Sequence, residues 1–133
     1  MIFVDGNGDY IQNDSGIITG YPFTISAWVR PTRVNVNQTI AMFGPNNSSS
    51  ARFGIDLTNA GKAEARSINR AAVSSTILVA NRWYHIVGIF TGNSNRVVYV
   101  DGVQVGSNTQ SATLSTTLQQ RRVGRRPGTT TTY

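Results

Sequence analysis

The stretch NRWYHIVGIFTGNSNRVVYVDGVQV, residues 81–105, decides the fold of this chain. It predicts three consecutive antiparallel strands, and Asp101-Gly102 joins the last two because Asp-Gly favours a two-residue hairpin turn. That turn sets three cross-strand pairs: Val100 with Val103, Tyr99 with Gln104, and Val98 with Val105. Strand residues two apart share a face, so the four valines are expected to form one apolar patch. A sheet with one apolar side needs a second layer to cover it, which predicts a β-sandwich.

The rest of the chain continues this pattern. Residues 23–30, FTISAWVR, alternate between apolar and polar side chains, as expected for a strand with one face in the core. Further strands are predicted at residues 2–4, 10–11, 39–43, 52–57, 62–68, 75–78 and 121–126. Turn signals separate these strands and no helical period is present. The sequence therefore predicts one all-β domain over residues 1–133.

Composition limits the chemistry that the chain can perform. Its 133 residues suffice for a hydrophobic core, and it contains no cysteine. A disulfide framework, a thiolate nucleophile and a thiolate metal site are therefore excluded. No apolar run reaches the about 18 residues of a membrane span, so no membrane partner is expected. The opening MIFVDGNGDY lacks the basic and long apolar segments of a signal peptide, which predicts that a protein starting here is not exported by the general route.

Short motifs follow one another in an order that is typical of one family. They are FVDGNGDY at residues 3–10, FTISAWVRP at 23–31, NRWYHIV at 81–87, VYVDG at 98–102 and VGR at 123–125. Together they resemble the laminin-G-like branch of the concanavalin A-like lectin/glucanase superfamily. The resemblance implies a two-sheet antiparallel jelly-roll sandwich that recognises a glycan or a protein surface.

The chain differs from that family near its last residues. Family members continue past the VGR position into a closing strand, whereas this chain ends in TTTTY at residues 129–133. The resemblance therefore implies a sandwich without the closing strand. An open sheet edge has free N–H and C=O groups that can pair with another chain. We expect residues 2–4 or a neighbouring strand to pair with a partner subunit, which would give a homo-oligomer.

A candidate metal site lies in the first turn. Asp5, Asn7 and Asp9 have the oxygen-ligand spacing of the first half of a calcium loop. Tyr10 stands where such a loop has glycine, and Gly16 stands where it has a bidentate glutamate. The alternative is that these residues only form the turn after the first strand. Calcium is the one cofactor that the sequence suggests.

Trp28 and Arg30 lie on the face of their strand opposite the alternating apolar residues. An exposed aromatic ring there can stack on the CH side of a sugar ring. The alternative places Trp28 in the core between the sheets, because tryptophan is mostly buried. Trp83 is expected in the core. The predicted ligand contacts are Trp28, Arg30, Tyr99, Asn46 and Asn47, the last two in a loop at residues 45–50.

The sequence argues against catalysis. His85 is the only histidine, and a lone histidine in a strand is more often a packing residue than a catalyst. No serine or carboxylate is spaced for a triad. Glucanases of the resembling superfamily use paired carboxylates on one strand, whereas Glu64, the only glutamate, has no such partner in its segment. We therefore expect a protein that is not an enzyme.

Positive charge is concentrated in RRVGRR, residues 121–126, in a chain whose net charge is +6. Arg121, Arg122, Arg125 and Arg126 could hold phosphates or an acidic surface. The alternative is a solvent-exposed edge strand whose charges discourage aggregation. Nucleic-acid binding is disfavoured because no aromatic residues alternate with the arginines.

Two functions remain open. The first is a non-catalytic recognition or adhesion module of the laminin-G/lectin type, which binds a glycan or a protein and acts outside the cell. The second is a phage structural protein, such as a capsid decoration or fibre protein, which acts in the virion through contacts between subunits. Fold alone does not decide between them. Saturable glycan binding that Trp28→Ala removes would favour the first, and a stable homo-oligomer without glycan binding would favour the second.

Overall fold

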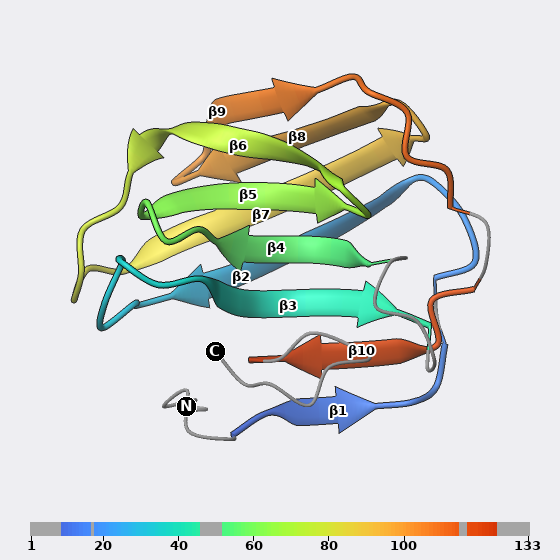
Figure 1. The fold of residues 1–133 in the computed structure, drawn as a ribbon, viewed down its shortest axis with the longest axis horizontal. Helices are drawn as coiled ribbons and strands as arrows, with labels where there is room; N and C mark the ends of the chain where they lie inside the picture. Colours follow the sequence, from blue (N-terminus) through green and yellow to red (C-terminus); the bar gives the residue numbers. More distant parts are fainter. Residues whose placement is uncertain (1–8, 17, 46–51, 115–116, 125–133) are drawn as a thin grey trace.

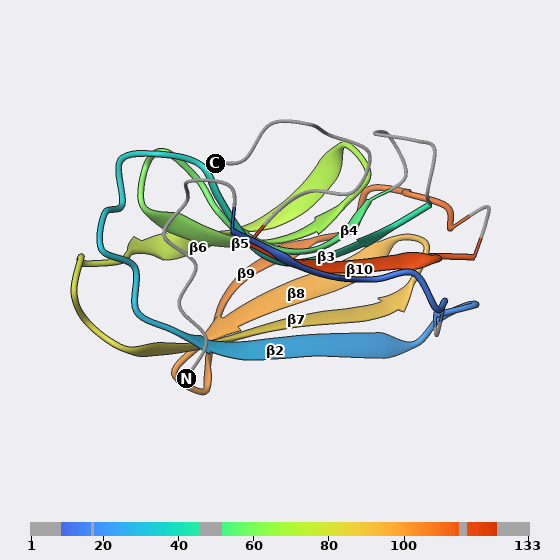
Figure 2. The ribbon, with the colours of Figure 1, turned by 90° about the horizontal axis from the view of Figure 1, so that it is seen from below.

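Two antiparallel β-sheets pack face to face in this computed structural model, which describes residues 9–16, 18–45, 52–114 and 117–124 (Figure 1). The larger sheet has the strand order β1 (Ile11–Asn13), β10 (Gln120–Val123), β3 (Gln38–Gly44), β4 (Phe53–Leu57), β5 (Lys62–Ser67) and β6 (Arg70–Ile77). The smaller sheet has the order β2 (Phe23–Val29), β7 (Tyr84–Gly92), β8 (Asn95–Val100) and β9 (Val103–Asn108). Turned by 90°, the molecule shows the sheets as two layers (Figure 2). The predicted all-β jelly-roll sandwich is confirmed.

The strand predictions agree with the structure apart from their ends. The weak strand expected at residues 75–78 is the end of a longer strand, β6. The strand expected at residues 2–4 lies outside the described residues, as do residues 125–133, on which the predicted lack of a closing strand depends. Within the described part of the chain, no helix is long and apolar enough to cross a membrane.

The core lies between the sheets and is built by strand alternation. In β2, Ile25 points inward and is buried, and β7 and β8 add further inward-facing residues. The larger sheet covers these side chains with β4 and β5, whose small alanines let the layers approach. Fully buried members of this core are Phe53, Ile55, Leu57, Ala63, Ala65, Ile86, Phe90 and Val98. Each large apolar side chain buried in this way stabilises the fold by about 1.5–3 kcal/mol.

An aromatic cluster closes one end of the core. The rings of Phe23 and Phe90, which are cross-strand partners, stack with their centroids 4.8 Å apart. Phe53 from the other sheet meets them edge-on, with its centroid 6.0 Å from that of Phe23 and 6.2 Å from that of Phe90. This arrangement ties the two sheets together, since edge-on aromatic pairs add about 0.5–1.5 kcal/mol to the burial of their area.

The hairpin turn at Asp101-Gly102 forms where the sequence predicts it. Both turn residues have positive φ, 51° and 81°, which is the conformation that a two-residue hairpin turn demands. Two of the three predicted cross-strand pairs are confirmed: Val100 with Val103, and Tyr99 with Gln104.

The third predicted pair is wrong. Val98 pairs with Gly106 instead of Val105, because a bulge interrupts the register of β8 and β9. At Gly106 the edges of the two sheets meet, and a Cβ there would collide with the carbonyl oxygen of Val73 in β6. The predicted patch of four valines is accordingly only partly in the core: Val98 is fully buried, whereas Val103 is 64% exposed near the turn.

Candidate functional site

The outer face of the four-stranded sheet is the candidate functional site, and we name it the platform. Residues of β2, β7, β8 and β9 that alternate with the core residues form this face. One row crosses all four strands through Ser26, Val87, Tyr99 and Gln104, and a second runs through Thr24, Ile89, Val97 and Ser107. Trp28 and His85, which pair with each other, complete the platform. Its side chains are apolar or uncharged polar apart from the titratable His85.

Trp28 points away from the core and is 67% exposed. The exposed-ring interpretation of the sequence is therefore confirmed, and the core interpretation is wrong. The reason is strand alternation: Ile25, Ala27 and Val29 point toward the other sheet, so Trp28 must point outward. Its indole stacks on the His85 ring with centroids 5.0 Å apart and an angle of 20° between the planes. One face of the indole is thereby supported, and the ring offers a flat apolar surface to the outside.

The hairpin turn holds the strand that carries His85. The backbone N–H of His85 donates to Asp101 Oδ1 at 2.8 Å, and the backbone N–H of Asp101 donates to the His85 carbonyl at 2.9 Å. This exchange joins the β8–β9 turn to β7. The expectation that His85 is a packing residue agrees with these contacts and with its stacking on Trp28.

Arg30 and Tyr99 contribute differently to this surface. Arg30 Nε donates to the Asn81 carbonyl at 3.0 Å, which ties the end of β2 to the turn before β7. The Tyr99 hydroxyl donates to Gln104 Oε1 at 3.1 Å, forming a polar pair in the middle of the platform. Tyr99 lies two strands and one row from Trp28, which corresponds to about 12 Å from the usual strand and residue spacings. The structure thus brings these predicted contact residues to one side of the smaller sheet.

Several predicted site residues cannot be placed. Asn46 and Asn47 lie outside the described residues, and so do Asp5 and Asn7 of the predicted calcium loop. Asp9 is exposed. No group of three or more His, Cys, Asp or Glu side chains that could hold a metal ion occurs in the described ranges. The calcium site remains a prediction from the sequence.

Trp83 is not a core residue, contrary to the expectation from the sequence. It is 49% exposed and precedes the first residue of β7. The buried aromatic residue at this point is Tyr84, whose hydroxyl accepts a hydrogen bond of 2.8 Å from the Val79 N–H. Because Tyr84 points inward, alternation turns Trp83 outward. The inward-facing aromatic residue is thus Tyr84 and not its neighbour Trp83. A run in which both faces are apolar does not show which of two neighbours points inward.

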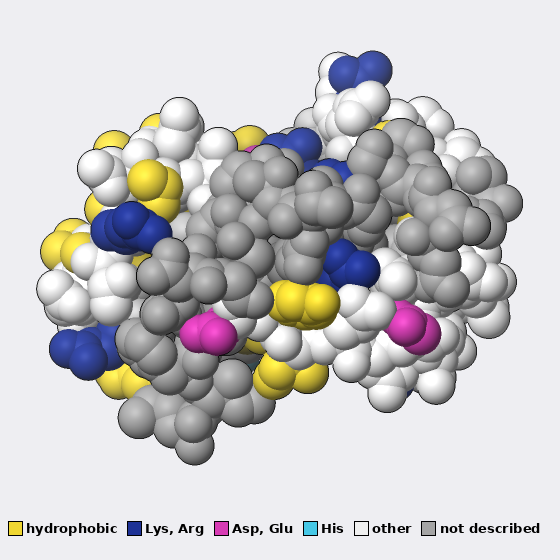
Figure 3. Space-filling view, turned by 60° about the horizontal axis from the view of Figure 1, so that its bottom comes forward, with side chains coloured by type: hydrophobic (Ala, Val, Ile, Leu, Met, Phe, Trp, Pro, Cys, Tyr) yellow, Lys and Arg dark blue, Asp and Glu magenta, His cyan; other side chains and the backbone are white. Residues whose placement is uncertain are grey.

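The described half of the basic cluster does not form one patch. Strand β10 lies between β1 and β3, so the alternative of a solvent-exposed edge strand is wrong. Arg121 pairs with Phe43 and Arg122 with Met42, which places the two arginines on opposite faces of the sheet. The Arg122 guanidinium lies 5.6 Å from the centre of the Tyr10 ring. Arg125 and Arg126 lie outside the described residues. With the β1 side turned forward, the coloured Lys and Arg side chains are scattered among polar and hydrophobic ones (Figure 3).

Glu64 has a carboxylate partner that the sequence did not reveal. Asp56 of β4 lies directly opposite Glu64 of β5 on the outer face of the larger sheet. Arg66 Nε donates to Glu64 Oε1 at 2.7 Å and lies 3.4 Å from Asp56 Oδ2. Asp56 is fully buried and Glu64 is 3% exposed. The expectation that Glu64 has no carboxylate partner within its own segment agrees with the structure, because the partner comes from a neighbouring strand. Paired carboxylates can serve hydrolysis when a substrate reaches them, but these two are buried and bound to an arginine.

The comparisons with known proteins give the family. A family model described as the concanavalin A-like lectin/glucanases superfamily matches residues 5–133, so the chain belongs to this superfamily. None of the curated proteins that were searched matches the sequence.

Solved structures share the fold at low sequence identity. Domains LG4-5 of the mouse laminin α1 chain superpose with a TM-score of 0.70 and 17% identity, covering 98% of this chain and 37% of that chain. A CBM40 module of the Ruminococcus gnavus IT-sialidase, bound to α2,3-sialyllactose, gives 0.64 and 17%, covering 92% and 84%. Domain 4 of an extracellular arabinanase from Geobacillus stearothermophilus, in complex with arabinotriose, gives 0.61 and 16%, covering 89% and 60%. The laminin-G-like resemblance is confirmed, and these identities establish the fold alone.

Proposed function

We propose that this chain is a non-catalytic recognition module that binds a glycan on the platform. The observation that carries the proposal is the exposed indole of Trp28, which stacks on His85 and leaves one flat face open. The CH face of a sugar ring has the matching shape and polarity.

The neighbours of Trp28 support a sugar more than an apolar ligand. Ser26, Thr24 and Ser107 supply hydroxyl groups, and the Tyr99–Gln104 pair supplies an amide and a phenol. Such groups donate to and accept from the hydroxyls of a saccharide, which fixes its orientation. Apolar side chains of Val87, Ile89 and Val97 are half-buried between them. The platform therefore combines apolar and hydroxyl-bearing side chains, as the surface of an oligosaccharide does.

The structural relatives agree with this proposal without deciding it. Two of them are carbohydrate-binding modules or domains whose structures contain sialyllactose and arabinotriose. Fold does not fix function, so the argument for a glycan rests on the platform. The relatives named here give no support to the alternative of a phage structural protein. A module of this kind would act outside the cell, as the arabinanase does.

The absence of catalysis is also part of the proposal. Glu64 and Asp56 are the paired carboxylates of the described residues, and Arg66 binds both of them. A glycosidase needs one protonated and one free carboxylate in contact with the substrate. Burial and the shared arginine oppose that arrangement.

A glycan array with matched variants tests the proposal. The wild-type chain should bind one or more neutral oligosaccharides saturably, and arabinotriose serves as a named probe. Trp28→Ala should abolish the binding while the circular dichroism spectrum stays unchanged. Tyr10→Ala is the control, because Tyr10 is an exposed aromatic residue beside β1 of the larger sheet, away from the platform. A folded wild-type chain that binds nothing on the array, or equal losses in the two variants, would overturn the proposal.

A second candidate is self-association through β1. Within the described part of the chain, β1 pairs with β10 on one side and with no strand on the other. Tyr10, Ile11 and Val123 are exposed apolar residues at this edge. An edge of this kind accepts a strand from a second copy. Light scattering at micromolar concentration tests this: Ile11→Lys should convert a dimer to a monomer, and a monomeric wild type would exclude it.

A further inference from the structure

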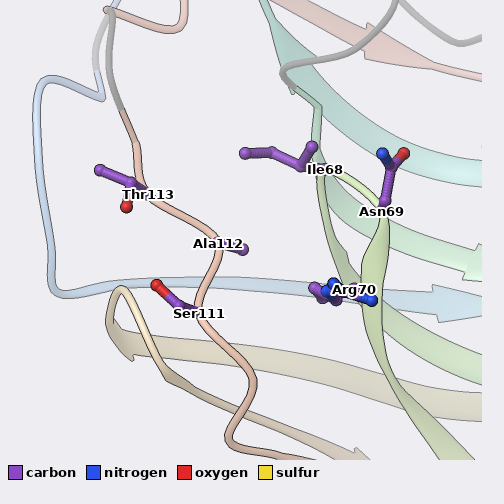
Figure 4. A pocket seen from close by; sticks show the side chains of 6 residues that line it. All are labelled: Ile68, Asn69, Arg70, Ser111, Ala112 and Thr113. Carbon is purple, nitrogen blue, oxygen red and sulfur yellow. The ribbon is translucent and has the colours of Figure 1, made fainter.

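A hollow of about 410 Å³ lies at the far end of the smaller sheet from Trp28. Two segments face each other across it, the turn at residues 68–70 and the loop at residues 111–113 (Figure 4). Its lining residues are Ile68, Asn69, Arg70, Ser111, Ala112 and Thr113. Strand β2 joins the two regions: Phe23 lies at the end that leads to the hollow, and Trp28 lies near the other end. The hollow is therefore separate from the platform.

We propose that this hollow is a second binding site, which takes the carboxylate-bearing end of an acidic sugar of the hexuronate class. Arg70 is the residue that recognises the carboxylate. It is exposed, and its guanidinium makes no hydrogen bond and no ion pair with the part of the chain that the structure describes. A planar guanidinium binds a carboxylate through two parallel hydrogen bonds.

A buried arginine beside the hollow adds positive charge. Arg96 is 1% exposed and donates to Asn108 Oδ1 at 3.1 Å, to the Asn93 carbonyl at 3.1 Å and to the Gln110 carbonyl at 2.5 Å. All three acceptors are uncharged, and no carboxylate among the described residues forms an ion pair with Arg96. The charge of Arg96 therefore reaches the hollow without local neutralisation.

The two arginines repel each other. Burial lowers the pKa of Arg96, and the Arg70 guanidinium lowers it further, while the Tyr21 phenol acts in the opposite direction. A bound anion next to Arg70 would relieve this repulsion. Two further hydrogen bonds hold the loop that forms one wall: the Ala112 N–H donates to the Asn93 carbonyl at 2.7 Å, and the Tyr21 hydroxyl donates to the Ala112 carbonyl at 3.0 Å. The wall is thus fixed before a ligand arrives.

The remaining lining residues favour a sugar over a bare anion. Ile68 and Ala112 direct apolar groups into the space between the two segments, whereas the Ser111 and Thr113 side chains point away from the turn at residues 68–70 (Figure 4). A sugar ring has apolar CH faces that match the side chains of Ile68 and Ala112, and an inorganic anion has none. Ile68 also has a φ of 55°, which is rare for a β-branched residue and belongs to the turn between β5 and β6.

D-Glucuronate and D-glucose test the inference, because they differ only in the carboxylate at C6. In an NMR titration, glucuronate should shift the backbone amide signals of residues 68–70 and 111–113 saturably. Glucose should bind at least about tenfold more weakly, as expected when a charge-assisted hydrogen bond is lost. Arg70→Gln should reduce glucuronate binding to the level of glucose. Arg33→Gln is the matched control, since it removes one positive charge from another exposed position.

Three results would overturn the inference: equal shifts with glucose, unchanged binding in Arg70→Gln, or equally effective competition by sodium sulfate. The proposed function fails separately. Trp28→Ala should leave glucuronate binding unchanged, and a loss there would mean that only one site exists, on the platform. If the chain binds glucuronate at the hollow but binds no neutral glycan, this inference is supported and the proposal of a glycan site on the platform fails.

Discussion

Asp56 and Glu64 lie directly opposite each other on β4 and β5, and one arginine, Arg66, binds both carboxylates. Like charges that face each other across a sheet destabilise it unless a counter-charge stands between them. Both carboxylates are buried, so Arg66 compensates negative charge that water reaches poorly.

Replacing Arg66 should therefore cost stability. Arg66→Ala leaves two buried carboxylates without their shared cation, which should lower the free energy of unfolding by about 3 kcal/mol. Urea denaturation measures this change. Arg33→Ala, at an exposed position, should change it by no more than about 0.5 kcal/mol. A loss under about 1 kcal/mol in Arg66→Ala would show that the cluster is not held by this ion pair.

Gly106 gives a test of the contact between the two sheet edges. A Cβ at Gly106 would collide with the backbone carbonyl of Val73, which cannot move aside as a flexible side chain can. Gly106→Ala should therefore lower the unfolding free energy by about 1–3 kcal/mol. A Cβ at Gly92 meets nothing within 4 Å, so Gly92→Ala should be neutral or slightly stabilising. If thermal unfolding shows the same stability for Gly106→Ala and Gly92→Ala, β6 and β9 do not approach each other as closely as described.

Tyr21 predicts the response to alkaline pH. Burial raises the pKa of the Tyr21 phenol above its ordinary value of 10.0, although the Arg96 charge acts in the opposite direction. The pKa of the phenol is higher in the folded state than in the unfolded state, so the folded state binds the proton more tightly. The contribution of Tyr21 to the free energy of unfolding is therefore complete below pH 10 and is lost as pH rises through the folded pKa. The free energy of unfolding of Tyr21→Phe should decrease less at alkaline pH than that of the wild type, because phenylalanine has no proton to release. Chemical denaturation at pH 8 and pH 11 compares the two chains, and parallel declines would refute the assignment.

The sequence predicted the outward side of β2 and failed at positions that depend on distant strands. Alternation in FTISAWVR put Trp28 opposite Ile25, because the period of a strand is local, although the usual burial of tryptophan left a core position open as the alternative. The Asp101-Gly102 turn was equally local. The bulge near Val105 was not, because it arises from the approach of β6, a strand about thirty residues earlier in the chain.

The candidate sites show the same division. The partner of Glu64 was missed because Asp56 belongs to another strand, and only the register of β4 and β5 brings them together. The hollow at Arg70 was missed for the same reason, since its walls are about forty residues apart in sequence. A hint was present in Arg96, a charged residue directly before the valine-rich run. Such a residue in an inward-facing position must find partners, and it finds them in the loop that forms the hollow.

Trp28→Ala should separate binding from stability. The exposed side chain makes its main contact with His85 on the surface, so its removal should change the unfolding free energy by no more than about 0.5 kcal/mol. Its loss from a stacked sugar should weaken glycan binding at least about tenfold. Calorimetric titration and urea denaturation of the same sample measure the two quantities. A variant that unfolds more easily and binds as well as wild type would reverse both expectations.

The indole N–H signals in an NMR spectrum give the sharpest test of the platform. The chain has two tryptophans, so Trp83→Phe assigns the signals of Trp28 and Trp83 without doubt. During titration with the neutral oligosaccharide that binds best on the array, the Trp28 signal should move saturably and by more than the Trp83 signal, because alternation puts Trp83 at the end of the same face. A glycan that binds with the Trp28 signal unmoved, or that moves only Trp83, would contradict recognition through the outer face of the four-stranded sheet.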